Sequence, residues 1–214
     1  MKQILLRLCT AVILVLGATA GLQAGEEYHE GFEYFKIVPT QPTQAKTGQI
    51  EVVEIFWYGC PSCFRFEPHI NKWIKNKAKN VVFYRVPASF NPGWEIHAKA
   101  FYTAELLKIG EQIHTPFFDA LHKHGKKLES KESIGKFFAK FGIKKNRFEQ
   151  VFDSFQVEMR VKQAKIIVSK YGVSGVPTMI VNGKYRVSTS KNEANPFEKL
   201  IKIVNFLIAI ETKN

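Results

Sequence analysis

The sequence predicts an α/β fold in which a mixed β-sheet is flanked by helices and interrupted by an all-helical insertion. Three observations support this prediction. A strand, a helix and a second strand follow one another up to Pro87, residues 91–156 hold only amphipathic helical patterns, and a helix, a hairpin and a last helix come after them. Both ends of the chain therefore contribute strands to the same sheet.

Length and composition allow one well-packed core with an elaborated insertion. The chain has 214 residues, 45% of them hydrophobic, and its 18 phenylalanines favour an aromatic core. The formal net charge is +12, but the lysines are spread through amphipathic segments. This pattern favours a solvated basic surface, and we expect no nucleic-acid partner.

The first 24 residues have the pattern of a secretory signal peptide. Lys2 and Arg7 precede the apolar run Leu8–Ala20, and small residues follow up to Ala24. The apolar run has 13 residues, whereas a membrane-spanning helix needs about 20. We therefore expect an exported protein whose signal peptide, residues 1–24, is cleaved.

The first part of the sheet domain is a βαβ unit. A polar segment with one short strand near Tyr34–Ile37 comes first, and the β-branched and aromatic run "QIEVVEIFWYG" then predicts a buried strand that ends at Gly59. Apolar residues at helical spacing predict a helix from Pro61, and Asn80–Pro87 predicts the second strand. This order implies a parallel pair of strands.

The insertion is predicted from four amphipathic stretches that glycines separate. Gly110, Gly125 and Gly142 are expected where helices end, and Ser130 with Ser133 offers capping chemistry at a helix start.

The last segment completes the sheet. Val157–Tyr171 predicts a long helix, "TMIVNGKYRV" predicts a β-hairpin with an Asn-Gly turn, and Asn195–Ile210 predicts a closing helix. We therefore assign residues 25–90 and 157–214 to the sheet domain and residues 91–156 to the helical insertion.

Cys60 and Cys63 are the only cysteines left once a signal peptide containing Cys9 is removed. A zinc site needs about four ligands, and no spacing ties His122 or His124 to the pair, so we expect no metal. An inert structural bridge is also disfavoured, because closing so short a loop removes little entropy from the unfolded chain.

The position of the pair at a helix start favours redox chemistry. The free N–H groups and positive dipole end of the first turn stabilise a thiolate at Cys60 and lower its pKa. An exported protein meets oxidants, so the Cys60–Cys63 disulfide can be made and broken. We expect no cofactor other than this disulfide.

Two segments on either side of the helical insertion carry a resemblance to a known family. "EIFWYGCPSCFRFEP" and "GVSGVPTMIVNGKY", with the rest of Tyr28–Ile210, resemble the DsbA family of periplasmic thiol:disulfide interchange proteins. The resemblance implies a thioredoxin-like fold with an inserted helical domain. It also implies a periplasmic oxidoreductase that introduces disulfide bonds into exported proteins.

The same resemblance assigns roles to four residues. Cys60 would be the exposed attacking cysteine and Cys63 the buried resolving cysteine. Pro177 would be a cis-proline facing them, and Val176 would offer backbone groups to an extended substrate segment. The alternative for Pro177 is an ordinary proline at the start of a strand.

The chain departs from the family at two places that bear on the cysteine pKa. Ser62 stands where DsbA usually has histidine, and Phe83 stands at the position of a buried lysine. Glu54 and Glu67 match the family's carboxylates, and Arg85, on the same strand face as Phe83, is a candidate to replace the lysine. The alternatives are a first-turn carboxylate for Glu67 and a surface arginine for Arg85.

The implied partners are unfolded exported proteins with free thiols and a quinone-linked membrane reoxidase of the DsbB type. Two other functions stay open at this point. A disulfide isomerase or reductase of the DsbC-like type usually carries an N-terminal dimerisation domain, for which the segment before the first motif is short. A thiol-dependent binding protein or chaperone would bind clients without turnover.

Overall fold

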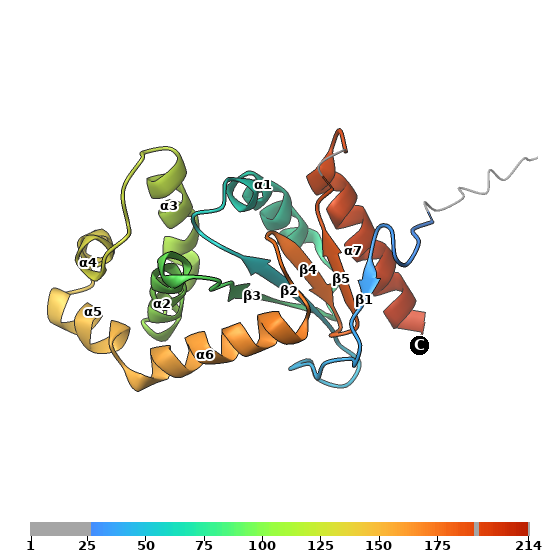
Figure 1. Ribbon diagram of the computed structural model, residues 1–214, viewed down its shortest axis with the longest axis horizontal. Helices are drawn as coiled ribbons and strands as arrows, with labels where there is room; N and C mark the ends of the chain where they lie inside the picture. Colours follow the sequence, from blue (N-terminus) through green and yellow to red (C-terminus); the bar gives the residue numbers. More distant parts are fainter. Residues whose placement is uncertain (1–26, 191–192, 214) are drawn as a thin grey trace, which may run out of the picture.

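The computed structural model describes residues 27–190 and 193–213, and the predicted signal peptide lies outside them. A single mixed sheet is covered by helices on both faces, and a helical body lies at one end of it (Figure 1). No helix in the described part of the chain is long and apolar enough to cross a membrane.

The sheet has five strands in the order β1-β5-β4-β2-β3. They are β1 (Phe35–Lys36), β2 (Ile50–Phe56), β3 (Val81–Pro87), β4 (Thr178–Val181) and β5 (Tyr185–Ser188). The interior strand β2 is buried along its whole length, runs parallel to β3 and pairs antiparallel with β4. The predicted parallel pair is confirmed.

The predicted hairpin between β4 and β5 is also confirmed. Asn182 and Gly183 both have positive φ values, 51° and 63°, as a two-residue hairpin turn that matches the strand twist requires. Strand β4 also pairs antiparallel with β2, with Thr178 opposite Ile55, so the residues that precede Thr178 arrive at the end of β2 that leads to the cysteines.

Seven helices complete the described chain. They are α1 (Pro61–Asn76), α2 (Pro92–Leu106), α3 (Gly110–His122), α4 (Lys131–Ala139), α5 (Lys145–Phe152), α6 (Phe155–Lys170) and α7 (Pro196–Lys213). Helices α1 and α7 pack on one face of the sheet, whereas α6 packs on the other and extends to the helical body formed by α2–α5 (Figure 1).

Helix boundaries agree with the expected caps except at one glycine. Ser130 caps α4, since its hydroxyl accepts the N–H of Ser133 and the Ser133 hydroxyl accepts the N–H of Ser130, both at 3.1 Å. The expectation that Gly110 ends a helix is wrong, because Gly110 is the first residue of α3. A Cβ atom at this position would meet only the end of the flexible Glu105 side chain, which can move aside.

The helical body has an aromatic core that continues to the cysteines. Phe56, Tyr58 and Phe118 belong to the same buried cluster as Cys60 and Cys63. The Phe118 ring contacts Phe56 and Tyr58 with centroid distances of 6.0 and 5.0 Å. The insertion therefore supports the segment that leads into the cysteine pair.

Replacing Phe118 with alanine tests this support. Phe118 is 1% exposed, so Phe118→Ala is expected to lower the free energy of unfolding by about 3–5 kcal/mol. Phe155 is 74% exposed, and Phe155→Ala is the matched control, with an expected change within about 0.5 kcal/mol. Urea unfolding of the reduced proteins measures both, and equal losses would contradict the packing described.

Candidate active site

The cysteine pair begins helix α1. Cys60 is the N-cap residue, and its Sγ accepts the backbone N–H of Cys63 at 3.2 Å. Pro61 occupies the first turn, where its fixed φ suits a helix start and its missing N–H costs nothing. Both cysteines are free thiols. Because Cys60 is the N-cap and Cys63 lies in the first turn of α1, the two sulfurs are close together.

Cys60 is less exposed than expected. Its exposed fraction is 8%, against 0% for Cys63. The carbonyl oxygen of Val176 lies 3.5 Å from the Cys60 Sγ, so the segment before β4 closes over the sulfur. Cys60 is still the more accessible of the two.

The two thiols have opposite pKa shifts. The pKa of Cys60 is lowered to about 6, first by the hydrogen bond from the Cys63 thiol, then by the backbone N–H groups of Cys63 and Ser62 and by the charge of Arg65, against the opposing effect of burial. Burial raises the pKa of Cys63 far above its usual range. At neutral pH the reduced site therefore holds a Cys60 thiolate and a Cys63 thiol.

Val176 and Pro177 lie where the resemblance implied. The Val176–Pro177 peptide bond is cis, and β4 begins at the next residue, Thr178. When Cys60 is protonated, its thiol can donate to the Val176 carbonyl. The structure thus brings this segment into contact with the sulfur, although 116 residues separate them in sequence.

Glu54, Glu67 and Arg85 form one buried ionic group near the cysteines. Glu54 on β2 is the direct cross-strand neighbour of Arg85 on β3. The Arg85 Nε lies 3.0 Å from Glu54 Oε2, and its Nη2 lies 3.4 Å from Glu67 Oε1. Both carboxylates therefore share one guanidinium.

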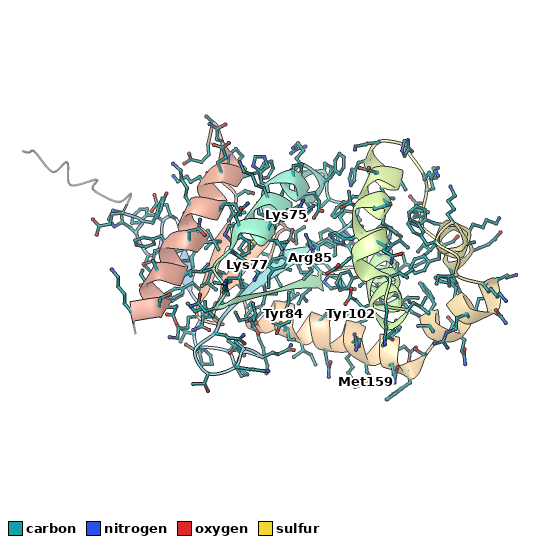
Figure 2. All side chains as sticks on the ribbon, turned by 180° about the vertical axis from the view of Figure 1, so that it is seen from behind. Lys75, Lys77, Tyr84, Arg85, Tyr102 and Met159 are labelled. Atoms are coloured by element: carbon teal, nitrogen blue, oxygen red, sulfur yellow. The ribbon has the colours of Figure 1, made fainter. Side chains whose placement is uncertain are left out.

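The alternative of a surface arginine is wrong. The Arg85 side chain is 17% exposed, and it lies between α1 and the helical body when the molecule is seen from behind (Figure 2). Phe83, at the family's lysine position, packs edge-on against Trp73, and the Arg85 guanidinium lies 5.2 Å from the Phe83 ring centroid. Arg85 therefore supplies the positive charge that Phe83 lacks. The alternative of a first-turn carboxylate for Glu67 is also wrong, because the first turn of α1 (Pro61–Asn76) holds no acidic residue.

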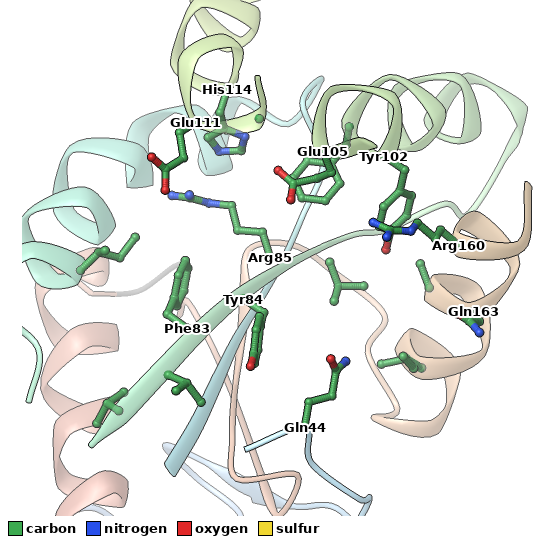
Figure 3. A pocket seen from close by; sticks show the side chains of 18 of the residues that line it. Gln44, Phe83, Tyr84, Arg85, Tyr102, Glu105, Glu111, His114, Arg160 and Gln163 are labelled. Carbon is green, nitrogen blue, oxygen red and sulfur yellow. The ribbon is translucent and has the colours of Figure 1, made fainter. Parts of the chain in front are cut away.

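Two further members of this network, His114 and Tyr58, were missed in the sequence. His114 Nε2 lies 3.2 Å from Glu67 Oε1, and His114 Nδ1 lies 2.9 Å from the Tyr58 hydroxyl. Figure 3 shows Arg85 reaching from β3 toward His114 on α3. The only sequence signal was that position 114 falls on the buried face of a helix.

The charges of this network follow from burial and its hydrogen bonds. Burial raises the pKa of Glu54 to about 7 despite the opposing charge of Arg85. Burial also lowers the pKa of His114, which stays neutral. Burial opposes ionisation of Glu67, but the His114 hydrogen bond and the Arg85 charge outweigh it and lower the Glu67 pKa. Glu54 can therefore exchange a proton near neutral pH.

A cavity of about 880 Å³ borders this network. It lies between β3 and helices α2, α3 and α6 (Figure 3) and is lined by Arg85 and His114 but by neither cysteine. Solvent can thus reach the ionic group through a cavity that neither cysteine lines. The described residues hold no cluster of three or more His, Cys, Asp or Glu side chains suited to a metal ion.

Comparisons with known proteins identify the family. A model of the DSBA-like thioredoxin domain matches residues 82–201. The thiol:disulfide interchange protein DsbA of Azotobacter vinelandii is 40% identical over 199 residues, covering 93% of this chain and 92% of the relative. The chain belongs to the DsbA family. DsbA of Pseudomonas aeruginosa is 37% identical over 205 residues, covering 95% of this chain and 96% of the relative.

Solved structures agree with this family assignment. The crystal structure of Pseudomonas aeruginosa DsbA matches with a TM-score of 0.79 at 38% identity, over 86% of this chain and 94% of that one. DsbA from Xylella fastidiosa matches with a TM-score of 0.79 at 32% identity, over 85% and 96%. The expected thioredoxin-like fold with added helices is confirmed. The protein is a thiol:disulfide oxidoreductase that introduces disulfide bonds, and isomerase activity is not favoured.

Removing the Arg85 charge tests the ionic group. Arg85→Met leaves two buried carboxylates without their partner and should lower the free energy of unfolding by about 3–5 kcal/mol at pH 8. The pKa of Glu54 is about 7 with Arg85 present and should rise further when the guanidinium is removed. As pH falls, Glu54 of the variant therefore takes up a proton in the folded state before it would in the unfolded state, so the loss of stability should shrink. Arg85→Lys is the charge-preserving control. A loss that is equal at pH 5 and pH 8 would contradict the pairing.

The opposite thiol pKa shifts predict selective alkylation. Brief iodoacetamide treatment of the reduced protein should label Cys60 and spare Cys63, with a rate that rises around the Cys60 pKa of about 6. Peptide mass mapping reads the two sites, and the urea-unfolded protein, in which both should react alike, is the control. Equal labelling in the folded state would refute the assignment.

Proposed function

We propose that Cys60 and Cys63 are the residues that oxidise client proteins. A client thiolate attacks Sγ of Cys60 in the Cys60–Cys63 disulfide, the S–S bond breaks, and Cys63 leaves and takes up a proton. A second client thiolate then attacks the client sulfur of the mixed disulfide and releases Cys60 as a thiolate. The client loses two electrons and two protons, and the cysteine pair gains the electrons.

One observation carries this assignment. At the start of α1, hydrogen bonds from the Cys63 thiol and from the N–H of Cys63 lower the pKa of Cys60 to about 6, and the resulting thiolate is a good leaving group. A stable leaving thiolate favours the reduced enzyme and therefore the oxidised client. No cofactor beyond this disulfide is needed in the proposed reaction.

Val176 and Pro177 are proposed to bind the client next to the sulfur. Val176 places a backbone carbonyl 3.5 Å from the Cys60 Sγ, and an extended client segment can pair with exposed backbone groups. Such pairing would hold the client cysteine in line with the disulfide. Glu54 and Glu67, paired with Arg85, and Ser62 between the cysteines are proposed to tune the thiol pKa values.

The clients are proposed to be unfolded exported proteins, and the site of action the periplasm. The support is the pattern of residues 1–24, which is typical of a cleaved signal peptide, together with membership of the DsbA family. The reduced enzyme needs an oxidant, and a quinone-linked membrane protein of the DsbB type is the proposed reoxidase.

The proposed assignment is tested with a reduced, unfolded protein that needs disulfides for its own activity. The oxidised wild-type protein should restore that activity and become reduced in equal amounts, whereas Cys60→Ser should restore none. A client with scrambled disulfides is the second substrate. Faster recovery from scrambled than from reduced client would favour an isomerase, and binding without thiol consumption would favour a chaperone.

Ser62 should make this protein a weaker oxidant than its Ser62→His variant. A histidine between the cysteines adds positive charge beside the Cys60 sulfur, whereas serine adds at most a hydrogen-bond donor. We expect the variant's Cys60 pKa to fall by about one unit, which corresponds to roughly 30 mV for a two-electron couple. Thiolate absorbance against pH measures both proteins. An equal or higher pKa in the variant would contradict the prediction.

A further inference from the structure

Two histidines on helix α3 hold the residue that lies two positions before Cys60. His122 Nε2 lies 2.7 Å from the backbone oxygen of Tyr58, and His114 Nδ1 lies 2.9 Å from the Tyr58 hydroxyl. The spacing of the two histidines, eight residues, is slightly more than two helical turns, so both lie on the same face of α3. Tyr58 is thus held by its main chain and by its side chain.

The donors and acceptors of these bonds follow from the partners. A carbonyl oxygen only accepts, so Nε2 of His122 carries the hydrogen. A carboxylate also only accepts, so Nε2 of neutral His114 donates to Glu67 and its Nδ1 accepts from the Tyr58 hydroxyl. Each N–H or O–H donor in these three hydrogen bonds therefore faces an acceptor.

The segment held by α3 determines where the Cys60 sulfur lies. Tyr58 is 2% exposed, and the N–H of Cys60 donates to the Trp57 carbonyl at 3.0 Å, which closes a turn around Tyr58. The Trp57 ring stacks on Trp94 of α2 with centroids 4.1 Å apart. Two helices of the insertion therefore contact this turn, α2 at the Trp57 ring and α3 at the Tyr58 backbone.

His122 also touches the helix that carries Cys63. Its ring stacks on Phe64, the residue after Cys63, with centroids 4.8 Å apart and planes 10° from parallel. One imidazole thus contacts the turn before Cys60 through a hydrogen bond and the first turn of α1 through its face. Loss of its hydrogen bond would leave the turn before Cys60 free to move relative to the first turn of α1.

We propose that His122, assisted by His114, is a positioning residue for the thiol chemistry: it holds the Tyr58 turn so that Sγ of Cys60 stays in hydrogen-bond contact with the N–H of Cys63. The inference rests on the proposed role of Cys60 and adds to it a function for the helical insertion. The N–H···S contact of 3.2 Å depends on both the turn and the helix start, which His122 joins through its hydrogen bond to Tyr58 and its stacking on Phe64. Without the anchor, the contact lengthens and stabilises the thiolate less.

Two variants of His122 separate its hydrogen bond from its stacking. His122→Phe keeps a ring for Phe64 but has no donor for the Tyr58 carbonyl, whereas His122→Gln keeps a donor near the place of Nε2 and has no ring. We expect the Cys60 pKa of His122→Phe to rise by about half a unit to one unit, with several-fold slower alkylation at pH 6. His122→Gln should stay close to wild type.

The matched control is His124→Phe, because His124 is exposed just beyond the end of α3 and should leave the Cys60 pKa unchanged. Near-ultraviolet circular dichroism checks that each variant is folded, and His122→Ala replaces His122→Phe if the latter does not fold. Thiolate absorbance against pH and the alkylation rate are measured on all reduced proteins, beside client oxidation by each oxidised protein.

The outcomes separate this inference from the proposed function. A raised Cys60 pKa in His122→Phe alone supports the positioning role. If wild-type protein oxidises clients and His122→Phe has the wild-type pKa, the positioning role is wrong. If His122→Gln shifts as much as His122→Phe, the hydrogen bond is not the anchor and the inference fails. If wild-type protein itself does not oxidise clients, the proposed function fails instead.

Discussion

The hydrogen bond from the N–H of Cys63 to the sulfur of Cys60 is the interaction on which the chemistry of this protein depends. It exists because Cys60 caps α1, so the first turn directs its unpaired N–H groups at one sulfur and leaves the other inside the helix. The Cys63 thiol and then the N–H groups of this turn lower the pKa of Cys60 by hydrogen bonding to its sulfur, while burial raises the pKa of Cys63. One helix start thus makes two chemically different thiols from identical side chains.

The rest of the fold brings other elements to that helix start. The pairing of β4 with β2 brings Val176 to the sulfur, and the pairing of β2 with β3 sets Arg85 beside Glu54. Two buried carboxylates near a thiolate would oppose its charge, and the shared guanidinium offsets them. The helical insertion also contributes, because His114 on α3 hydrogen-bonds to both Tyr58 and Glu67. The site is therefore built from segments distant in sequence.

The sequence predicted the parts of this site that depend on local pattern. The order of strands and helices, the cap at Cys60 and the Asn-Gly hairpin follow from spacing and turn chemistry, and family resemblance added Val176, Pro177 and Glu54. His114 and His122 were not predicted, because their partner Tyr58 lies 56 and 64 residues away. Helical periodicity indicates which face is buried but not what covers it. The burial of Cys60 was missed for the same reason, since it depends on a distant segment.

The redox equilibrium between this protein and glutathione tests most directly whether a stabilised Cys60 thiolate drives the reaction. Each unit by which the Cys60 pKa falls should favour the reduced form by about 30 mV. With that pKa lowered to about 6, we expect a reduction potential well above the roughly −270 mV of thioredoxin. A potential at or below that of thioredoxin would show that the helix-start thiolate does not set the direction of disulfide exchange.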